Sequence, residues 1–541
     1  MKYVDNGIPH ASTATYFRRF LFGMILAAIY LLGSYASLKT NVTWDTEQEQ
    51  RDLVINVKAV KGLLKGDLTD YQTLLAYSDK YYGMGFDAPA SVIQTLAYKS
   101  VAKYFGADNA TAYLTTKQWI TFTLFFVSAV LFFLLSRRVT EDELFSMLAT
   151  LGYLLWPYIL GQSFLNVKDI PFLFGWFLGL YLSSLMAEKY CRTQRITRTS
   201  VCILAIITGW SMSIRMPGGL ALIQYCFVFI SAWWFVPQHA PNEIRMFGKH
   251  LLLFLLVTTI AVFLSSPVFW LGPQRIFDAI EYMRHHPLAL LGHCTLTLGE
   301  CMFAAALPAT YLPAWLSIKL PLIVIAGYLA LPFSFRKYSK NISSACILKP
   351  AIYTSITITV LLWATGAMLF NEIRHILFLM PLFFFAGIHS LYFLSKKLAT
   401  ALLIITIGLF SLDNVLAYPY QYIWFNEIAR QFQVENYFET DYWGSSGRSL
   451  AKKFLASSAD KPFNCAYIDG DLTGRLFLHW ESIGCVHDEF PGPETQRPYF
   501  IVGYTRTGVR QYPANCTELE REHLKLLGGK DIVLGRIVYC R

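Results

Sequence analysis

The chain has 541 residues, of which 55% are hydrophobic and only 15% are charged, and its formal net charge is +10. A soluble protein carries about 25% charged residues, so the composition excludes an ordinary soluble enzyme and indicates a polytopic helical membrane protein. The positive excess is typical of the cytoplasmic loops of such proteins. No basic arm interleaved with aromatic residues indicates binding of nucleic acid.

The first apolar stretch, residues 20–38, directly follows Arg18 and Arg19. A basic segment before an apolar one is typical of a signal peptide or of an uncleaved signal anchor. The length of this stretch, and the many apolar stretches that follow it, favour the anchor.

Eleven apolar runs predict transmembrane helices, each of about 20 residues. They are residues 20–38, 118–135, 144–161, 170–186, 200–214, 217–236, 250–267, 315–334, 351–370, 375–394 and 399–417. With the N-terminus inside, every second loop is expected to face the cytoplasm. Each of these loops carries Lys or Arg, as the positive-inside rule requires. The C-terminus is then expected outside.

This topology predicts two domains and three large outer segments. Residues 1–417 are expected to form the membrane domain, with residues 39–117 and 268–314 as its large outer loops. Residues 418–541 are more polar and contain the short runs FNCAYID, RPYFIVGY and DIVLGRIVYC. Such runs are typical of strands, so this segment is expected to be a small α/β domain.

Six cysteines fall in the outer segments, where an oxidising compartment favours disulfides. The sequence leaves their connectivity open, and no CxxC spacing indicates a zinc ribbon or a redox motif. The candidates are Cys465, Cys485, Cys516 and Cys540 in the C-terminal segment, and Cys294 and Cys301 in the preceding outer loop.

Five basic residues lie near the outer ends of the predicted spans, on the side where the positive-inside rule disfavours Lys and Arg. Charges within a bilayer are costly and mark functional sites by default. Local pairing, of Lys168 with Asp169 and of Arg374 with Glu372, and snorkelling to the headgroups are the plain alternatives. Converging cations would instead suit a lipid phosphate, such as that of a polyprenyl-linked sugar. The five are Lys168, Arg215, Arg284, Lys319 and Arg374.

Acidic residues begin the first outer loop, in the stretch NVTWDTEQEQ. Attack of a hydroxyl on a sugar carbon needs a general base, and a carboxylate is the usual one. Asp45 and Glu47, next to Trp44, are the candidates, although a solvated loop would also be rich in acids.

The chain resembles the GT-C fold membrane glycosyltransferases, specifically the glycosyltransferase family 39-like proteins. These are relatives of the protein O-mannosyltransferases and of the lipid A aminoarabinose transferases. The resemblance covers most of the chain. It rests on the order of TWDTEQEQ, YYGMGFDAP, FLNVKDIPFLFGWFLGLYL, SIRMPGG, LPATYLPAWLSIKLPL, EIRHILFLMPL, YPYQYIWFNEIAR and FETDYWGSSGRSLAKKF.

This resemblance implies transfer of a sugar from polyprenyl phosphate to an acceptor on the outer face of the membrane, with inversion at the anomeric carbon. It makes Asp45 the catalytic base. Thr46 stands where the family has a second acid, so Glu47 is the weaker candidate for a helper. The partners implied are the polyprenyl-phosphate-linked sugar, an acceptor glycan, lipid or protein, and membrane lipids. The location implied is the inner (plasma) membrane, with the N-terminus cytoplasmic and the C-terminus periplasmic.

Further candidates surround these residues. Asn166, Lys168 and Asp169 begin a span and are placed to bind a headgroup, although Asp169 followed by Pro171 is also a helix-start signal. His375 is expected to contact the same phosphate or to pack. Trp44, Tyr82 and Asp87 are candidates for the substrate cleft.

No metal site is predicted, because the histidines at 285, 286 and 293 show no ligand spacing. The resemblance implies no obligatory cofactor, and a divalent cation stays an open alternative. A transporter or flippase for a polyprenyl-linked lipid or sugar is the second functional hypothesis. It is less favoured because the sequence shows no internal repeat of the kind typical of transporters.

Overall fold

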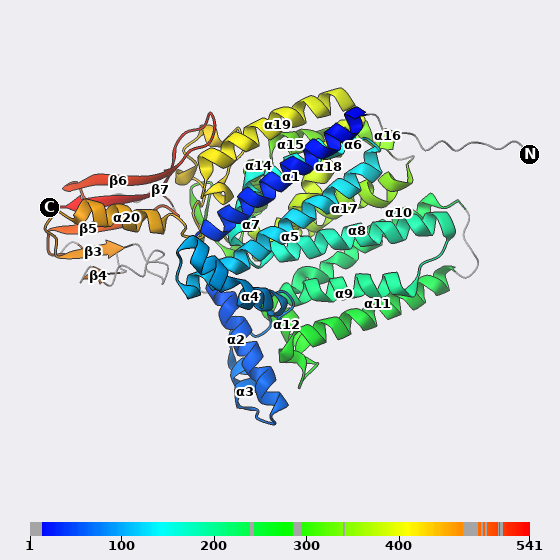
Figure 1. Cartoon of the computed structure of the whole chain (residues 1–541), viewed down its shortest axis with the longest axis horizontal. Coiled ribbons are helices and arrows are strands. Elements are labelled where there is room, and N and C mark those ends of the chain that lie inside the picture. Colours follow the sequence, from blue (N-terminus) through cyan, green and yellow to red (C-terminus); the bar gives the residue numbers. More distant parts are fainter. Residues whose placement is uncertain are drawn as a thin grey trace, which may run out of the picture.

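A helical bundle with a small β-sheet at one end makes up the molecule (Figure 1). The structure is a computed structural model. It describes residues 13–237, 243–284, 294–338, 341–468, 485–487, 491–492, 495–506, 508 and 512–541.

Eight helices in the described part of the chain are long and apolar enough to cross a membrane. The chain is therefore a multi-pass membrane protein, as predicted. The eight are formed by α1 (Thr13–Lys39), α5 (Asn109–Thr140), α8 (Asp169–Thr193), η1 (Met216–Leu220) with α10 (Ala221–Phe235), α11 (Glu243–Ser265), η4 (Ser344–Leu348) with α17 (Lys349–Ala364), η5 (Arg374–Leu379) with α18 (Met380–Leu394), and α19 (Lys396–Ala417).

The other three predicted spans are helical but are not single long helices. Two are pairs bent by 54° and 114° at a break. Pro157 and Pro321 lie at the two breaks, where proline cannot donate the backbone hydrogen bond that would continue a helix. The pairs are α6 (Glu143–Leu155) with α7 (Pro157–Leu165), and α14 (Tyr311–Lys319) with α15 (Leu322–Leu329); the third is the shorter α9 (Arg198–Ile214).

The basic loops predicted for the cytoplasmic side lie together at one end of the bundle. Arg19 pairs with Glu143, and Lys396 pairs with Asp142 at 2.6 Å. These contacts join the start of α1, the start of α6 and the start of α19. The short α16 (Leu331–Tyr338) ends nearby, where Lys337 donates to the carbonyl of Leu394 at 3.0 Å. The opposite end of the bundle carries the sheet (Figure 1).

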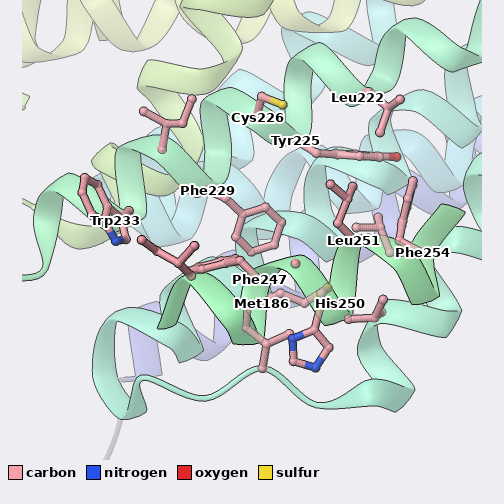
Figure 2. Close-up of a pocket in the computed structure, with 16 residues that line it drawn as sticks. Met186, Leu222, Tyr225, Cys226, Phe229, Trp233, Phe247, His250, Leu251 and Phe254 are labelled. Atoms are coloured by element: carbon pink, nitrogen blue, oxygen red, sulfur yellow. The ribbon is translucent and has the colours of Figure 1, made fainter. Parts of the chain in front are cut away.

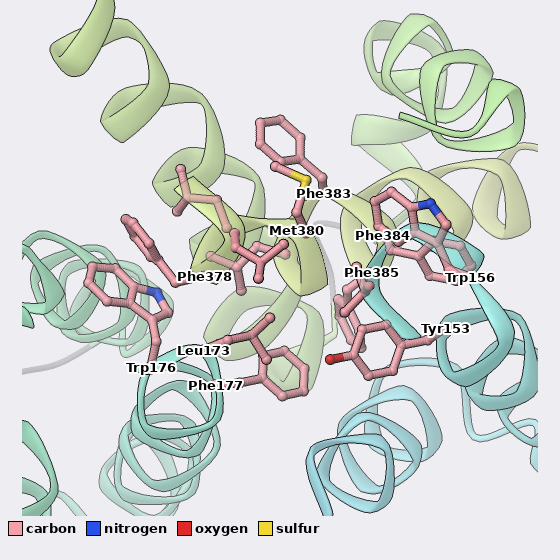
Figure 3. Close-up of a cluster of buried hydrophobic side chains, with 14 of the residues drawn as sticks. Tyr153, Trp156, Leu173, Trp176, Phe177, Phe378, Met380, Phe383, Phe384 and Phe385 are labelled. Carbon is pink, nitrogen blue, oxygen red and sulfur yellow. The ribbon is translucent and has the colours of Figure 1, made fainter. Parts of the chain in front are cut away.

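The core of the bundle is built from aromatic side chains around α18 (Figure 3). Phe132 stacks on Tyr153 with ring centroids 4.9 Å apart, and Phe384 and Phe385 of α18 pack against them. Within its most apolar stretch, the η5–α18 span is 89% buried. This helix is therefore a rigid support for η5 and its first residue, Arg374.

Residues 39–117, predicted as the first outer loop, form helices beside the bundle: α2 (Trp44–Leu64), α3 (Thr69–Ala76) and α4 (Asp87–Phe105). Gly106 ends α4 in the left-handed conformation, and the side chain of Asp108 caps α5 by accepting from the amide of Thr111. Asp87 forms a buried ion pair with Lys117 of α5. These contacts fix α4 against the bundle.

Residues 268–314, predicted as an outer loop, and the turns after α19 are mostly short elements. They are η2 (Pro267–Phe269), α12 (Arg275–Arg284), the hairpin of β1 (Cys294–Thr297) and β2 (Glu300–Phe303), η3 (Ala304–Ala306), η6 (Gln421–Ile423), η7 (Ala429–Gln431) and η8 (Val434–Asn436).

The C-terminal sheet has five strands in the order β4-β3-β5-β7-β6. The strands are β3 (Cys465–Ile468), β4 (Val486–His487), β5 (Tyr499–Tyr504), β6 (Cys516–Leu524) and β7 (Ile532–Cys540), and α20 (Gly447–Ser458) packs on them. The three predicted runs became β3, β5 and β7. The strand β6 (CTELEREHL) escaped prediction because its charged residues lie at the sheet edge, where charges protect against pairing with other chains.

All six candidate cysteines form disulfides in this structure. Cys516 and Cys540 lie directly opposite each other on paired strands, and Cys465 is joined to Cys485. Cys294 closes the β1–β2 hairpin with Cys301. The pairing that the sequence left open is thus between neighbours in the sheet or hairpin.

Candidate active site

A cavity of about 760 Å³ opens at the end of the bundle that carries the sheet. Its walls come from α2, the loop before α4, the start of α8, the turn after α9, and the segment from the end of α17 to η5. Several residues singled out in the sequence line it, although they come from distant parts of the chain. They are Asp45, Tyr82, Lys168, Arg215, Arg374 and His375.

Helix α2 presents one acidic face to this cavity. Asp45, Gln48 and Glu49 line it, and their spacing of three and four residues places them on one side of a helix. Glu47 lies two residues after Asp45 and is not among the lining residues. The side chain of Trp44 is 38% exposed and does not line the cavity either.

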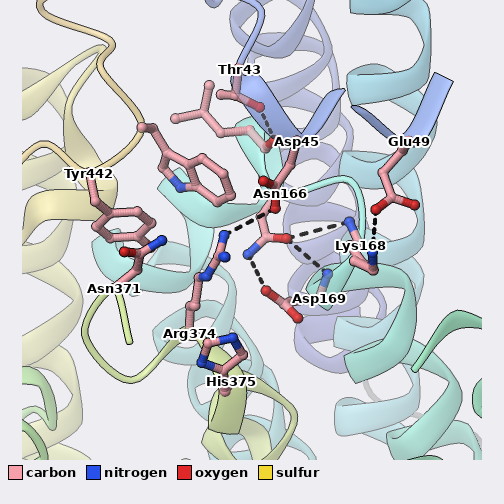
Figure 4. A network of polar contacts seen from close by, with 12 residues as sticks. Thr43, Asp45, Glu49, Asn166, Lys168, Asp169, Asn371, Arg374, His375 and Tyr442 are labelled. Carbon is pink, nitrogen blue, oxygen red and sulfur yellow. Dashed lines mark hydrogen bonds and ion pairs between the residues drawn. The ribbon is translucent and has the colours of Figure 1, made fainter. Parts of the chain in front are cut away.

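Asp45 and Arg374 form an ion pair across the cavity, with Asp45 Oδ2 and Arg374 Nη1 3.0 Å apart (Figure 4). The guanidinium carbon lies 5.1 Å from the ring centroid of Trp443 and 5.3 Å from that of Phe370. Arg374 Nε is buried without a hydrogen-bond partner in the described structure. The arginine is thus held by rings and still has a donor to offer.

Lys168 occupies the neighbouring wall. Its ammonium group pairs with Glu49 and lies 3.2 Å from the ring centroid of Tyr82. Lys168 is 7% exposed and Glu49 is 5% exposed, so this pair is almost wholly removed from solvent. The tyrosine predicted for the cleft therefore serves as a cation–π partner of the lysine.

The turn at residues 166–169 holds the third cation. The Asn166 side chain donates to Asp169 Oδ2 and accepts from the Asp169 amide, both at 2.8 Å. Asp169 in turn forms an ion pair with Arg215. Asn166 and Asp169 are buried and do not line the cavity, so they position Arg215 from behind it.

The partners of these cations are not their neighbours in the sequence. In the described structure Lys168 pairs with Glu49 rather than Asp169, and Arg374 pairs with Asp45 rather than Glu372. The alternative of local pairing is therefore wrong. Each cation that lines the cavity instead faces an acid from another segment.

A third acid on this face of α2, Asp52, was not singled out in the sequence. Asp52 Oδ1 accepts from the Tyr77 hydroxyl at 2.6 Å and from Gln48 Nε2 at 3.2 Å, while Gln48 also donates to Asp79 at 3.0 Å. Burial, together with the charge of Glu49, raises the pKa of Asp52 to about 7. The helical spacing of residues 45, 49 and 52 is the signal that could have identified this face.

Two other predicted residues, Lys319 and Asp87, lie away from the cavity. Lys319 and Glu372 form a fully buried pair, with Lys319 Nζ and Glu372 Oε1 2.9 Å apart, and burial raises the pKa of Glu372 to about 8. Asp87 pairs with Lys117 as described above. Arg284 ends α12, and its side chain lies outside the described residues, as do the histidines at 285, 286 and 293.

His375 follows Arg374 and lines the same cavity. Its ring packs on Phe370 with centroids 4.4 Å apart, and Nδ1 accepts from the Phe370 amide at 3.4 Å. The ring therefore packs, as one of the two expectations for this histidine had it, and contact with a phosphate stays a prediction.

One cluster among the described residues has the spacing of metal ligands, namely Cys465, Cys485 and His487. Its two cysteines share a disulfide, and a disulfide sulfur is not the thiolate that binds metals. This cluster lies in the C-terminal sheet, and none of its members lines the polar cavity.

A second cavity of about 550 Å³ lies between α10 and α11, with side chains from α9 and the end of α8 (Figure 2). Apolar and aromatic side chains, such as Phe229, Phe247 and Phe254, make up almost all of its lining, to which His250 contributes an imidazole. It lies toward the end of the bundle opposite the sheet, since Ile196 of the α8–α9 loop is part of its wall.

No protein-family model and no curated protein matches this sequence. Among solved structures, the chain is similar to the crystal structure of ArnT from Cupriavidus metallidurans in the apo state. The match has 12% sequence identity and a TM-score of 0.44, and it covers 98% of this chain and 98% of ArnT.

Proposed function

We propose that the protein is an inverting glycosyltransferase that moves a sugar from a polyprenyl-phosphate donor to an acceptor at the end of the bundle that carries the sheet. One observation supports this proposal above the others. Asp45 lines the same cavity as Lys168, Arg215 and Arg374. A carboxylate base and a set of cations for a phosphate leaving group are the groups that this transfer requires.

The reaction is a single displacement at the anomeric carbon. The acceptor hydroxyl attacks this carbon and loses its proton to Asp45, while the bond from the carbon to the phosphate oxygen breaks and its electron pair stays on the phosphate. The phosphate gains one negative charge in this step. Cations fixed beside that oxygen stabilise the transition state more than the bound donor, and this difference is what accelerates a reaction.

The ion pair of Asp45 with Arg374 gives these two residues linked roles. Without donor, the arginine holds the carboxylate in place. A bound phosphate competes for the guanidinium, whose five donors suit two acceptors at once. Arg374 then turns part of its hydrogen bonding toward the phosphate, and Asp45 is released to accept the proton of the acceptor.

Lys168 and Arg215 complete the phosphate site. Each is nearly buried and paired with one carboxylate, which keeps its side chain fixed. An ammonium group has three donors and a guanidinium has five, so each retains donors for a phosphate while it keeps its partner. Glu49 and Asp169 are therefore assigned as positioning residues.

A transporter of polyprenyl-linked lipids or sugars is the alternative. A transporter needs a polar route through the membrane, usually with a site near the bilayer midplane. The charged cavity of this protein lies at one end of the bundle, and the cavity toward the other end has an almost wholly apolar lining. This distribution favours a surface enzyme.

The experiment is to measure release of polyprenyl phosphate from a panel of polyprenyl-phosphate sugars by the purified protein and by Asp45→Asn. Turnover by the wild type, with a loss of at least about 100-fold in the variant, is expected for a general base. Glu47→Gln is the matched control, because it removes an acid of the same helical turn that does not line the cavity. Release by Asp45→Asn at the rate of the wild type would exclude the role of Asp45 and direct attention to Glu47. Lipid scrambling in vesicles without turnover of any donor would support the transporter.

A further inference from the structure

The segment before Arg374 has an unusual backbone. Asn371 and Glu372 both have positive φ values, 54° and 64°, in the left-handed region. A residue other than glycine is disfavoured there, because its Cβ comes too close to the following carbonyl oxygen. Two in succession persist only where surrounding contacts determine the conformation. The question is which contacts hold this segment, because Arg374 follows it directly.

Three parts of the molecule hold it. Thr295 of β1 accepts from the Asn371 amide at 3.0 Å, and the Tyr311 hydroxyl of α14 donates to the Glu372 carbonyl at 2.9 Å. The third contact comes from beyond the membrane domain. Arg506, which follows β5 of the C-terminal sheet, donates from Nη2 to Asn371 Oδ1 at 2.8 Å.

Arg506 is itself firmly held. Its Nε donates to Glu439 Oε1 at 2.7 Å, and the arginine side chain is 10% exposed. The amide of Thr505, the preceding residue, donates to the carbonyl of Leu534 at 3.1 Å, which ties this segment to the sheet. The Glu439 amide donates to the carbonyl of Leu296 at 2.8 Å, and Leu296 belongs to β1, the strand whose Thr295 also holds Asn371.

From these contacts we infer that Arg506 is a positioning residue for the transfer reaction. It fixes the Asn371–Glu372 turn, which sets where Arg374 meets Asp45 and the donor phosphate. The C-terminal domain is thereby a required part of the active site, although none of the residues that line the cavity lies beyond residue 378. This inference rests on the proposed function for its kinetic consequence, but the contact can be tested without it.

The kinetic test compares Arg506→Gln, Asn371→Gly and the double variant, using the donor that the wild type turns over. Glycine keeps the positive φ of residue 371 without strain while it removes the acceptor of Arg506. Each single variant should raise the KM for the donor about tenfold, because small displacements of a binding group have such effects. A loss of folded protein would instead lower kcat at constant KM.

The double variant separates a shared contact from two independent defects. If the Arg506–Asn371 contact carries the effect, the double variant should be no worse than the single ones. Effects that multiply, or a KM that stays at the wild-type value in both single variants, would overturn the inference. Arg521→Gln is the matched control, since it removes a half-exposed arginine of β6 that is paired with Glu518; it should leave KM unchanged.

Hydrogen exchange of the full-length protein provides the test that does not depend on activity. Exchange of the amides at residues 371–376 should rise in Arg506→Gln and stay at the wild-type level in Arg521→Gln. If the wild type turns over no donor, the proposed function fails, and this measurement alone judges the contact. Exchange at residues 371–376 that does not change in Arg506→Gln would overturn the inference whatever the kinetics show.

Discussion

Two cavities of the described structure, the polar one near the sheet and the apolar one between α10 and α11, are built partly on the same elements, yet their linings are chemically opposite. Both use α8 and the α9–α10 hairpin: Phe172 and Leu220 line the cavity near the sheet, while Met186 and Leu222 line the other. The first brings three cations and their acidic partners together, and the second is lined almost wholly by apolar groups.

The difference follows from where each cavity lies along the helices. The polar cavity is built where helices begin or end: Asp45 in the first turn of α2, Lys168 just before α8, Arg215 just after α9, and Arg374 at the start of η5. Charged groups at the ends of spans cost less than charges within them. The apolar cavity lies mostly along α10 and α11, and none of its lining residues is an Asp, Glu, Lys or Arg. The position of a cavity along the helices, and not its volume, therefore decides whether its lining is charged or apolar.

Asp45→Asn, in the polar cavity, should have the largest effect on transfer of all the substitutions proposed for the two cavities. Loss of a general base lowers kcat by about 10²–10⁴-fold. Asparagine has nearly the same shape and accepts a hydrogen bond from Arg374, so folding and donor binding should be retained. Steady-state turnover with the preferred donor measures this effect. A kcat near that of the wild type would mean that the cavity holds the donor but that another group accepts the proton.

Arg374→Gln should follow, with a loss of about 10- to 100-fold in kcat/KM, the range expected for a charge-assisted hydrogen bond of about 1.5–3 kcal/mol. The KM for the donor should rise, because the variant lacks a phosphate ligand. Arg374→Lys should recover only part of the loss, since an ammonium group cannot donate to Asp45 and phosphate in the same planar arrangement. Full recovery by lysine would show that charge alone matters at this position.

The charge of Asp52 should give the polar cavity a pH dependence. Its pKa of about 7 means that the carboxyl is mostly neutral below neutral pH and ionised above it. Ionisation adds negative charge on α2, near Lys168, and opposes the negative phosphate. The KM for the donor should therefore rise about threefold from about pH 6 to about pH 8, the scale of a Coulomb interaction across a partly solvated site. Asp52→Asn should show no such rise, and an unchanged rise in that variant would assign it to another group.

The sequence predicted the bundle well because apolar periodicity depends on local composition. All eleven apolar runs are helical in the structure. It could not predict that 144–161 and 315–334 bend, since the bends depend on how Pro157 and Pro321 are packed. The charged edge strand β6 also lacks an apolar pattern and was missed.

The sequence predicted which residues belong to the candidate site better than it predicted which ion pairs they form. Positive charges against the topology bias identified Lys168, Arg215 and Arg374, which line one cavity. Their partners could not be read, because each pair except that of Arg215 with Asp169 joins segments more than 100 residues apart. Lys319 shares the same sequence signal, but its bent helix pair buries it against Glu372. A basic residue at the predicted outer end of a span is thus a charge that needs a partner. Only the fold decides whether that charge also lines a cavity.

Gly248→Leu, in the apolar cavity, should have the smallest effect on transfer. It tests whether that cavity takes part in the reaction. Gly248 lines the second cavity, and a Cβ built there meets no atom within 4 Å. Leucine can therefore fill part of the cavity without displacing neighbours, and filling apolar space changes stability by only about 1 kcal/mol. Transfer should change by less than about twofold if the cavities are independent. A loss as large as that of Arg374→Gln, in folded protein, would show that the apolar cavity takes part in the same reaction, and the contrast in lining would then describe two ends of one amphipathic ligand.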